Sequence, residues 1–505
     1  MEIDRASGPP PDGNGARSPL STSPASPASG RPRAKIIRNQ NACDACRSRK
    51  VRTRTATPAA TTRATTPTTA SKYYHISRQP GESVIIRHHL TRHLRAIIAG
   101  APSPNTTTGS HHSNRLALFA PEDLIKRMLH DWFEKVHALA PVLHRRRFLH
   151  RLKAGEANTD RTFCALVVSV CAATVATLRR VDYSPVTVER CLDFIEEQHL
   201  LDHGLRKPVY SLDWCVAMYN IGTSASSMNE DGLGDMGSFH GMSEAAAGAR
   251  FLAYYRMADL DMSEQQLLKR LFWLIFAAYC IVSHQENRAH LRPLPLTDSQ
   301  LETGPQLSHA ELPPWHGDTT SYVPGLNQLS DLFLIWHEAQ TAPISLYGGQ
   351  EEALKHWLAK IQTIIDNFPP ELRWRGGLSR PCHITEGHDT QIANLFITSL
   401  NIRSNLLQKF GSTVKTRAAE HQRIVDDLLE ILYHMPQHVL EQNGNSLIPK
   451  LRDCGAAYME QMDVGDGALV SEGARLKLEK LLRKLDDIDC WPGLPGIESP
   501  QSNRQ

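Results

Sequence analysis

The chain has 505 residues, a formal net charge of +3 and 41% hydrophobic residues. This length exceeds that of one compact core and predicts two or more folded units with linkers. The charge is uneven, because residues 1–120 carry 18 Lys or Arg and only 5 Asp or Glu, which leaves the remainder acidic. A basic arm before an acidic body indicates an N-terminus that faces nucleic acid; a solvated, disordered tail is the alternative.

The composition also argues against a secreted or membrane-spanning protein. The longest apolar run, Phe163 to Leu178, has 16 residues, fewer than the roughly 20 that a membrane helix needs. No secretory signal precedes it. The ten Cys residues form no disulfide framework, and several lie in apolar helical patterns where buried, reduced thiols are typical: Cys164, Cys171, Cys191, Cys215 and Cys280. We therefore expect a soluble intracellular protein with no membrane partner.

Residues 1–38 form the first predicted segment, a disordered tail. Pro, Ser, Gly and Ala dominate it, and such a composition cannot bury enough surface to offset chain entropy. The stretch Arg31 to Arg38, RPRAKIIR, is similar to part of a nuclear-import patch. It predicts a nuclear location.

Residues 39–54 contain the clearest motif of the chain. Cys43 and Cys46 form a C-x2-C pair, which brings two thiolates within reach of one metal ion. Basic side chains follow at once and supply charge for phosphates and donors for guanine edges: Arg47, Arg49, Lys50 and Arg52.

The stretch resembles the start of the fungal six-cysteine binuclear zinc cluster, whose first half reads A-C-D-x-C-R-x-R-K-V-K-C. The resemblance implies a DNA-binding module in which six cysteines hold two zinc ions. Cys43 and Cys46 would be metal ligands, and the four basic residues would contact a CGG-like triplet in promoter DNA. Members of the family often bind as homodimers. The match ends at Arg52, because Thr53 stands where the family has its third cysteine.

Several readings of this departure remain open. The C-x2-C pair can be accidental, or it can be the start of a real cluster whose remainder is missing, which we favour. Completion by His88, His89 or His93 would need a spacing far beyond the usual 12–15 residues of a zinc finger. A frameshift or misplaced intron boundary is one hypothesis for the abrupt change, since nine of the 18 residues in 53–70 are Thr.

Residues 55–117 are predicted to be a low-complexity linker. From residue 118 the apolar residues recur at helical spacing and strand-like alternation is scarce. We therefore predict an all-α body, with a first part at 118–310, a continuation at 311–490 and a disordered tail at 491–505. The first expected helix begins at Pro121 and is ended by Pro141. The others are 161–179, 187–201, 211–221, 243–258, 264–286, 326–340, 350–367, 387–410, 416–440, 445–461 and 471–488.

Two segments of this body resemble the middle homology region of the same fungal regulators. The first, Asp131 to Arg151, has the family's aromatic helix and proline turn: Trp132, Phe133, His137, Pro141, Val142, Leu143, His144 and Phe148. We expect a helical corner there, not a catalytic site. The basic run Arg145 to Arg147 beside His144 is predicted to face solvent, because charge runs usually do.

The second segment, Glu264 to Pro295, resembles the family pattern "E.rRR.fW.lf" followed by Arg-Pro. Its matching residues are Lys269, Arg270, Phe272, Trp273, Arg292 and Pro293, and we expect Trp273 in the core. Tyr279 and Cys280 depart from the acidic–arginine pair of many members. The matches together cover about 122–300.

Signatures of nucleophilic, nucleotide-binding and metalloprotease enzymes are absent from the sequence, so we do not expect an enzyme. The resemblance implies a transcription regulator of a secondary-metabolite or nutrient pathway, with a helical domain that responds to a small-molecule effector in some members. The alternative is a regulator that has lost DNA binding and acts through protein or small-molecule contacts of its helical domain.

Overall fold

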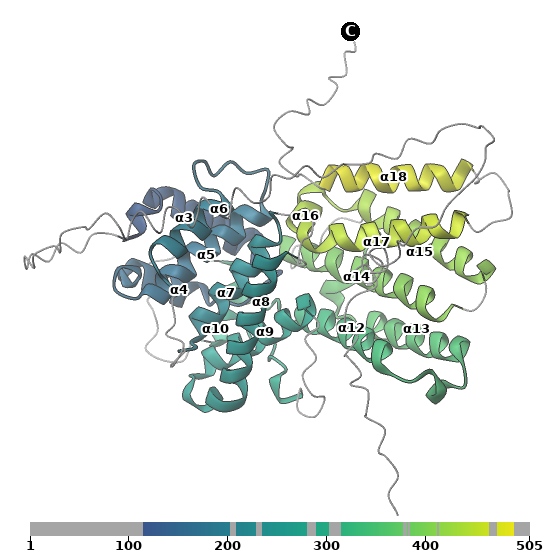
Figure 1. The fold of residues 1–505 in the computed structure, drawn as a ribbon, viewed down its shortest axis with the longest axis horizontal. Coiled ribbons are helices and arrows are strands. Elements are labelled where there is room, and N and C mark those ends of the chain that lie inside the picture. The colour runs from purple at the N-terminus through teal and green to yellow at the C-terminus, as the bar shows by residue number, and fades with distance from the viewer. Residues whose placement is uncertain are drawn as a thin grey trace, which may run out of the picture. The chain divides into compact units, whose positions relative to one another are not determined.

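The computed structural model describes residues 115–201, 209–228, 235–279, 289–301, 315–376, 381, 384–411, 414–463 and 472–488. These residues belong to one compact unit of the chain. They form helices joined by turns and loops, with no strand among them. The predicted all-α fold is confirmed (Figure 1).

The first helical region comprises residues 115–301. Its principal helices are α3 (Glu122–Asp131), η3 (Trp132–Val136), α4 (Arg145–Lys153), α5 (Arg161–Thr177), α6 (Val188–Glu197), α7 (Leu212–Ala225), α8 (Met236–Phe251), η6 (Leu252–Arg256), α9 (Met262–Tyr279) and the short α10 (Asp298–Leu301). Both η3 and η6 are π-helical and directly continue the α-helix before them.

The second helical region comprises residues 315–488. It contains the short α11 (His316–Thr319) and then α12 (Val323–Thr341), α13 (Gln350–Asp366), α14 (Glu386–Phe410), α15 (Val414–His434), α16 (Gln437–Gln442), α17 (Gly444–Asp463) and α18 (Glu472–Ile488). α9 of the first region packs against α12, so the two regions are in direct contact.

Side-chain caps determine where many of these helices begin. Asp160 accepts hydrogen bonds from the backbone of Thr162 and Phe163 at the start of α5. Ser211 caps α7, and Thr187 caps α6, in the same manner. Each cap satisfies donors that have no partner inside the helix. The predicted starts at 161, 187 and 211 therefore agree closely with the structure.

Two predicted boundaries are wrong. The helix predicted at 416–440 is divided into α15 and α16, because Pro436 forms the start of a new helix. α8 begins seven residues before the predicted position 243, although it contains glycines. The reason is close packing: a Cβ on Gly241 would lie 2.8 Å from the Gly222 backbone of α7, so only glycine permits this crossing.

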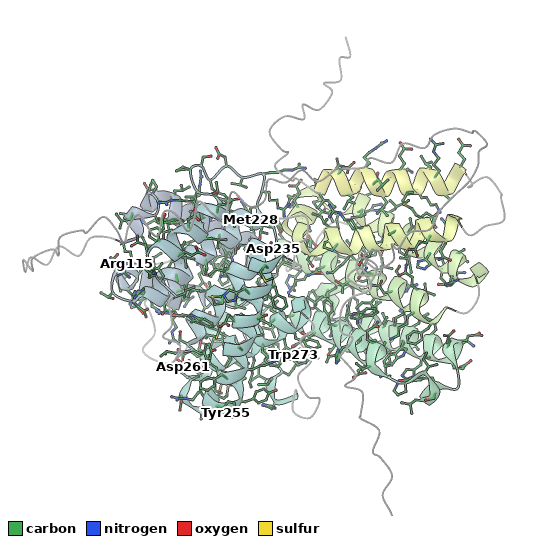
Figure 2. The ribbon with its side chains drawn as sticks, viewed as in Figure 1. Arg115, Met228, Asp235, Tyr255, Asp261 and Trp273 are labelled. Carbon is green, nitrogen blue, oxygen red and sulfur yellow. The ribbon has the colours of Figure 1, made fainter. Side chains whose placement is uncertain are left out.

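Each helical region has its own hydrophobic core. The first core includes Trp132, Phe163 and Trp273, and the second includes Trp357 and Phe410. The prediction that Trp273 is a core residue is confirmed (Figure 2). Cys164, Cys171, Cys191 and Cys215 are buried free thiols, as predicted, whereas Cys280 lies outside the described residues.

Candidate functional site

The predicted zinc and DNA ligands lie outside the described residues: Cys43, Cys46, Arg47, Arg49, Lys50 and Arg52. Within the part of the chain that the structure describes, no group of three or more His, Cys, Asp or Glu side chains could hold a metal ion. The candidate site in the helical body is therefore of another kind.

A pocket of about 820 Å³ opens between α4, α7, the end of α8 and the start of α9. This volume falls in the range of small-molecule sites. Its floor is apolar, with Phe148 of α4, Leu166 of α5 and Val216 of α7. A polar wall of arginines and carboxylates stands beside this floor, so the pocket can receive a ligand that has both an apolar and a polar part.

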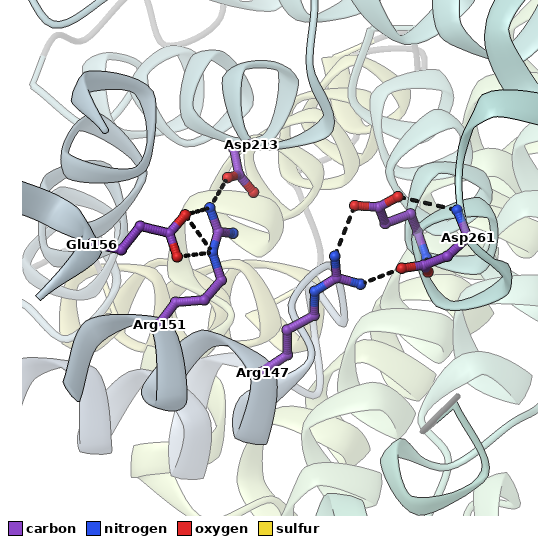
Figure 3. A network of polar contacts seen from close by, with 6 residues as sticks. Arg147, Arg151, Glu156, Asp213 and Asp261 are labelled. Carbon is purple, nitrogen blue, oxygen red and sulfur yellow. Dashed lines mark hydrogen bonds and ion pairs between the residues drawn. The ribbon is translucent and has the colours of Figure 1, made fainter. Parts of the chain in front are cut away.

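Arg147 of α4 forms one half of the polar wall (Figure 3). Its Nη1 lies 2.7 Å from Asp261 Oδ2, and its Nη2 lies 2.9 Å from Glu264 Oε1. These two acids also cap α9, because each accepts the backbone N–H of the other. Burial would raise the pKa of Asp261, but these hydrogen bonds and Arg147 lower it. Arg147 thus fixes the start of α9 against α4.

Arg151, one turn further along α4, forms the other half (Figure 3). It donates to both oxygens of Glu156, and its Nη2 also lies 2.7 Å from Asp213 Oδ2 of α7. Its guanidinium stacks over Phe163 at 4.0 Å from the ring centre. Burial alone would lower the pKa of Arg151, but the bonds to Glu156 and Asp213 outweigh it and raise the pKa.

Aromatic side chains form a further wall of the pocket. The rings of Tyr210 and Phe251 lie 5.7 Å apart, and both line the pocket. Tyr255, on the π-helical turn η6, stacks on Phe251 and is 77% exposed (Figure 2). Single π-helical turns are frequent at functional sites. The aromatic wall therefore continues to the molecular surface.

The prediction that the basic run beside His144 faces solvent is wrong. Arg145 and Arg146 are only 4% and 8% exposed. The backbone N–H of Arg145 donates to Asp298 Oδ2, and Arg146 pairs with Asp318 at 3.2 Å. These charges can be buried because carboxylates approach them: Asp318 pairs with Arg146, and Glu134, Asp318 and Asp298 act on the charge of Arg145.

His144 is buried as well and begins α4. Its Nδ1 accepts from the backbone N–H of Arg147, so Nε2 carries the proton and donates to the Asp298 carbonyl oxygen, 3.0 Å away. The expected helical corner is present, but its basic residues have structural partners. Only Arg147 keeps substantial solvent exposure.

The residues of the second resemblance hold the segment 289–301 along α9. Arg270, 2% exposed, donates to the carbonyl oxygens of Pro141 and Leu296, at 3.2 and 2.9 Å. Trp273 Nε1 donates to Leu291 O at 2.9 Å, and Arg292 stacks over the same indole. Burial lowers the pKa of Arg270 to about 10. These residues connect both resembling segments into one contact network.

A second polar cluster surrounds Lys450 of α17. Its Nζ donates to Asn394 Oδ1, Thr398 Oγ1 and Ser446 Oγ at 2.7–2.9 Å. All three partners are neutral, and burial lowers the pKa of Lys450 to about 7. The pocket described above does not border the Lys450 cluster. We therefore do not treat this cluster as the candidate site.

The sequence prediction did not include Arg151, Glu156, Asp213 or Tyr210. One signal was available: Arg147 and Arg151 are four residues apart and therefore share one helix face. The acids that meet them come from three separate segments, and their approach cannot be read from spacing.

Comparison with known proteins adds no relative, because no protein family, curated protein or solved structure matches this chain. Among the described helices, none combines the length and the apolar character needed to cross a membrane.

Proposed function

We propose that the chain is a fungal transcription regulator of the zinc-cluster class and acts in the nucleus. Cys43 and Cys46 would bind zinc, and Arg47, Arg49, Lys50 and Arg52 would contact CGG-type promoter DNA. The helical body would be a regulatory domain that responds to a small molecule. Its target would be a secondary-metabolite or nutrient-utilisation pathway.

One observation carries the proposal. Two segments, 131–151 and 264–295, resemble the same family in their sequence patterns. Pro141 from the first and Arg270 from the second form a direct hydrogen bond, and Trp273 and Arg292 extend the same network. Accidental matches more than 100 residues apart would not be expected to meet in one network. This supports a shared structural role and, with it, the family resemblance.

The pocket supports a regulatory role for the helical body. It lies between elements that ion pairs hold together, so a ligand there would contact α4, α7 and α9 at once. Such a ligand could stabilise one arrangement of these helices and shift the population of states.

The alternative is a regulator that lacks DNA binding and acts through its helical body. Thr53 in place of a third cysteine favours it, because structural zinc needs four ligands.

Zinc analysis and DNA binding of the full chain decide between the two. If the chain binds DNA through a zinc cluster, we expect about two zinc ions per chain. We also expect it to bind a CGG-containing duplex with an affinity that falls steeply as the salt concentration rises. A duplex with the triplet scrambled is the control. A protein without zinc that binds both duplexes equally or not at all would leave only the alternative.

Substitutions test whether Cys43 and Cys46 are the zinc ligands. Replacing Cys43 and Cys46 by Ser should abolish zinc and CGG binding together, whereas Cys191→Ser, at a buried position of α6, should leave both unchanged. Sequencing the transcript across codons 52–75 tests the gene-structure hypothesis, and a transcript that retains Thr53 to Ala70 would reject it.

A further inference from the structure

We infer that the pocket between α4, α7, α8 and α9 binds an organic amine, with its ammonium at Asp213 and its apolar body on the aromatic and aliphatic walls. If the helical body is a regulatory domain, as proposed above, this amine would be its effector. The inference depends on the charge, the available acceptors and the walls of the pocket.

The charge of the polar wall disfavours an anionic ligand. Arg147, Arg151 and Arg256 each have a carboxylate partner already. Four acids line the pocket beside these three arginines, so carboxylates exceed arginines by one: Glu156, Asp213, Asp259 and Glu264. An anion that bound a remaining N–H of Arg256 would meet these carboxylates at close range. A cation compensates the excess charge.

Asp213 is the acid with capacity for a further donor. Its Oδ2 accepts from Arg151, while its Oδ1 makes no hydrogen bond with any described residue. The side chain is 24% exposed and lines the pocket. In contrast, Asp261 and Glu264 use both oxygens for Arg147 and the α9 cap. An ammonium group has three donors and can bind Asp213 Oδ1 without breaking the ion pair to Arg151.

The start of α7 offers a competing attraction for anions, since helix N-termini carry partial positive charge. Ser211 already accepts the Trp214 N–H there, and the carboxylate of Asp213 lies in the first turn. The full negative charge of the Asp213 carboxylate outweighs the partial positive charge, about half a unit, at the start of α7. The cation therefore remains the favoured ligand at this position.

The remaining walls suit the apolar part of an amine. Tyr210 and Phe251 present aromatic surface, and Phe148, Leu166 and Val216 form the floor. Cations bind well beside aromatic rings. A strongly polar metabolite would leave this floor without a partner. The pocket is thus matched to an amine with an aromatic or branched aliphatic body.

Three probes of the same shape and different charge test this inference: 2-naphthylmethylamine, 2-naphthalenemethanol and 2-naphthoate. Calorimetric titration of the full chain at pH 7 should give the tightest binding for the amine. We expect about tenfold weaker binding for the neutral alcohol, the loss of one charged hydrogen bond, and weaker binding still for naphthoate. Equal or tighter binding of naphthoate, or no amine binding at about 1 mM, would overturn the inference.

Asp213→Asn should remove the preference for the amine over the alcohol and improve naphthoate binding, because Arg151 then has one carboxylate fewer. Glu156 still holds Arg151, so the fold should persist, and thermal unfolding checks this. Asp193→Asn, on the exposed face of α6, is the matched control and should leave all three affinities unchanged. Unchanged selectivity in Asp213→Asn would also overturn the inference. Amine binding with no effect on DNA binding would instead count against the proposed regulatory function alone.

Discussion

The two helical regions bury polar groups in different ways. The first region buries full charges and compensates them with opposite charges, as with Arg146, whose partner Asp318 comes from the start of the second region. The second region relies largely on neutral groups along its central helix α14. Thr390 donates to Gln442, and Asn394 accepts from Ser446 and Lys450.

This difference shows what each network does for the fold. In the first region the charges attach irregular segments, near residues 141, 296 and 298, to α4 and α9. In the second region the neutral bonds join helices that already pack side by side, chiefly α14 and α17. Charged networks here position loops, and neutral networks align helices.

The largest expected effect comes from breaking the charged network at its centre. Arg270→Met would leave the buried carbonyl oxygen of Pro141 without a donor and that of Leu296 with only the Ser321 hydroxyl. It would also remove one of the cations near the buried Asp298. We expect a loss of about 3–5 kcal/mol in the free energy of unfolding, measured by urea denaturation.

Lys269→Met, the neighbouring position on α9, is the control and should change stability by less than about 0.5 kcal/mol. Adding Asp298→Asn to Arg270→Met should recover part of the loss, since position 298 then carries no buried charge that Arg270 would have offset. Equal stability of the two single variants would contradict the central role of Arg270.

A smaller effect is expected where the two regions meet. Gln391 of α14 donates to the carbonyl oxygens of Ala138 and Tyr322, at 2.9 and 2.7 Å. Gln391→Met would leave Ala138 O unpaired and Tyr322 O with only the backbone N–H of Leu326, at a cost of about 1–3 kcal/mol. Hydrogen exchange should show faster opening on both sides of the contact.

Gln362→Met on the exposed face of α13 should leave stability and exchange unchanged. Faster exchange confined to α14 after Gln391→Met would mean that Gln391 does not couple the two regions.

The smallest expected effect is a pH response of the neutral network. Lys450 has a pKa of about 7 in the folded protein, whereas an unfolded lysine titrates near 10.4. Above pH 7 the unfolded chain therefore binds a proton that the folded chain has released, and stability rises with pH. Below pH 7 both states are protonated and the contribution is constant.

Relative to Lys450→Met, the wild-type protein should gain about 1–2 kcal/mol between pH 7 and pH 9, less than the full linkage value because water reaches part of the side chain. Denaturation at several pH values measures this difference. For Lys480→Met, at an exposed position of α18, the change of unfolding free energy with pH should be the same as for the wild-type protein. If the unfolding free energy of Lys450→Met changes with pH as that of the wild-type protein does, the pH response does not come from Lys450.

Most of the helical architecture could be predicted from the sequence because its signals are local. Apolar spacing marked α5, α7, α12 and α13 to within a few residues, and the capping residues Asp160 and Ser211 fixed the starts of α5 and α7. The prediction failed at Pro436 because this single residue starts a new helix within the apolar pattern. It failed at the glycine-rich start of α8 because the close crossing with α7 favours glycine there.

The candidate pocket could not be predicted in the same way. Its arginines share one face of α4, a helix that was not among those predicted from the sequence, and Glu156, Asp213, Asp261 and Glu264 come from three other segments. Only folding brings these acids to α4.

The sequence by itself therefore determined the all-α class, most helix boundaries, the burial of Trp273 and of the described cysteines, and the motif at Cys43 and Cys46. The tertiary structure decided which charges are buried, because the burial of Arg145 and Arg146 depends on Asp298 and Asp318. Helix periodicity is a property of neighbouring residues, whereas the free energy of a buried charge depends on partners that lie far away in the chain.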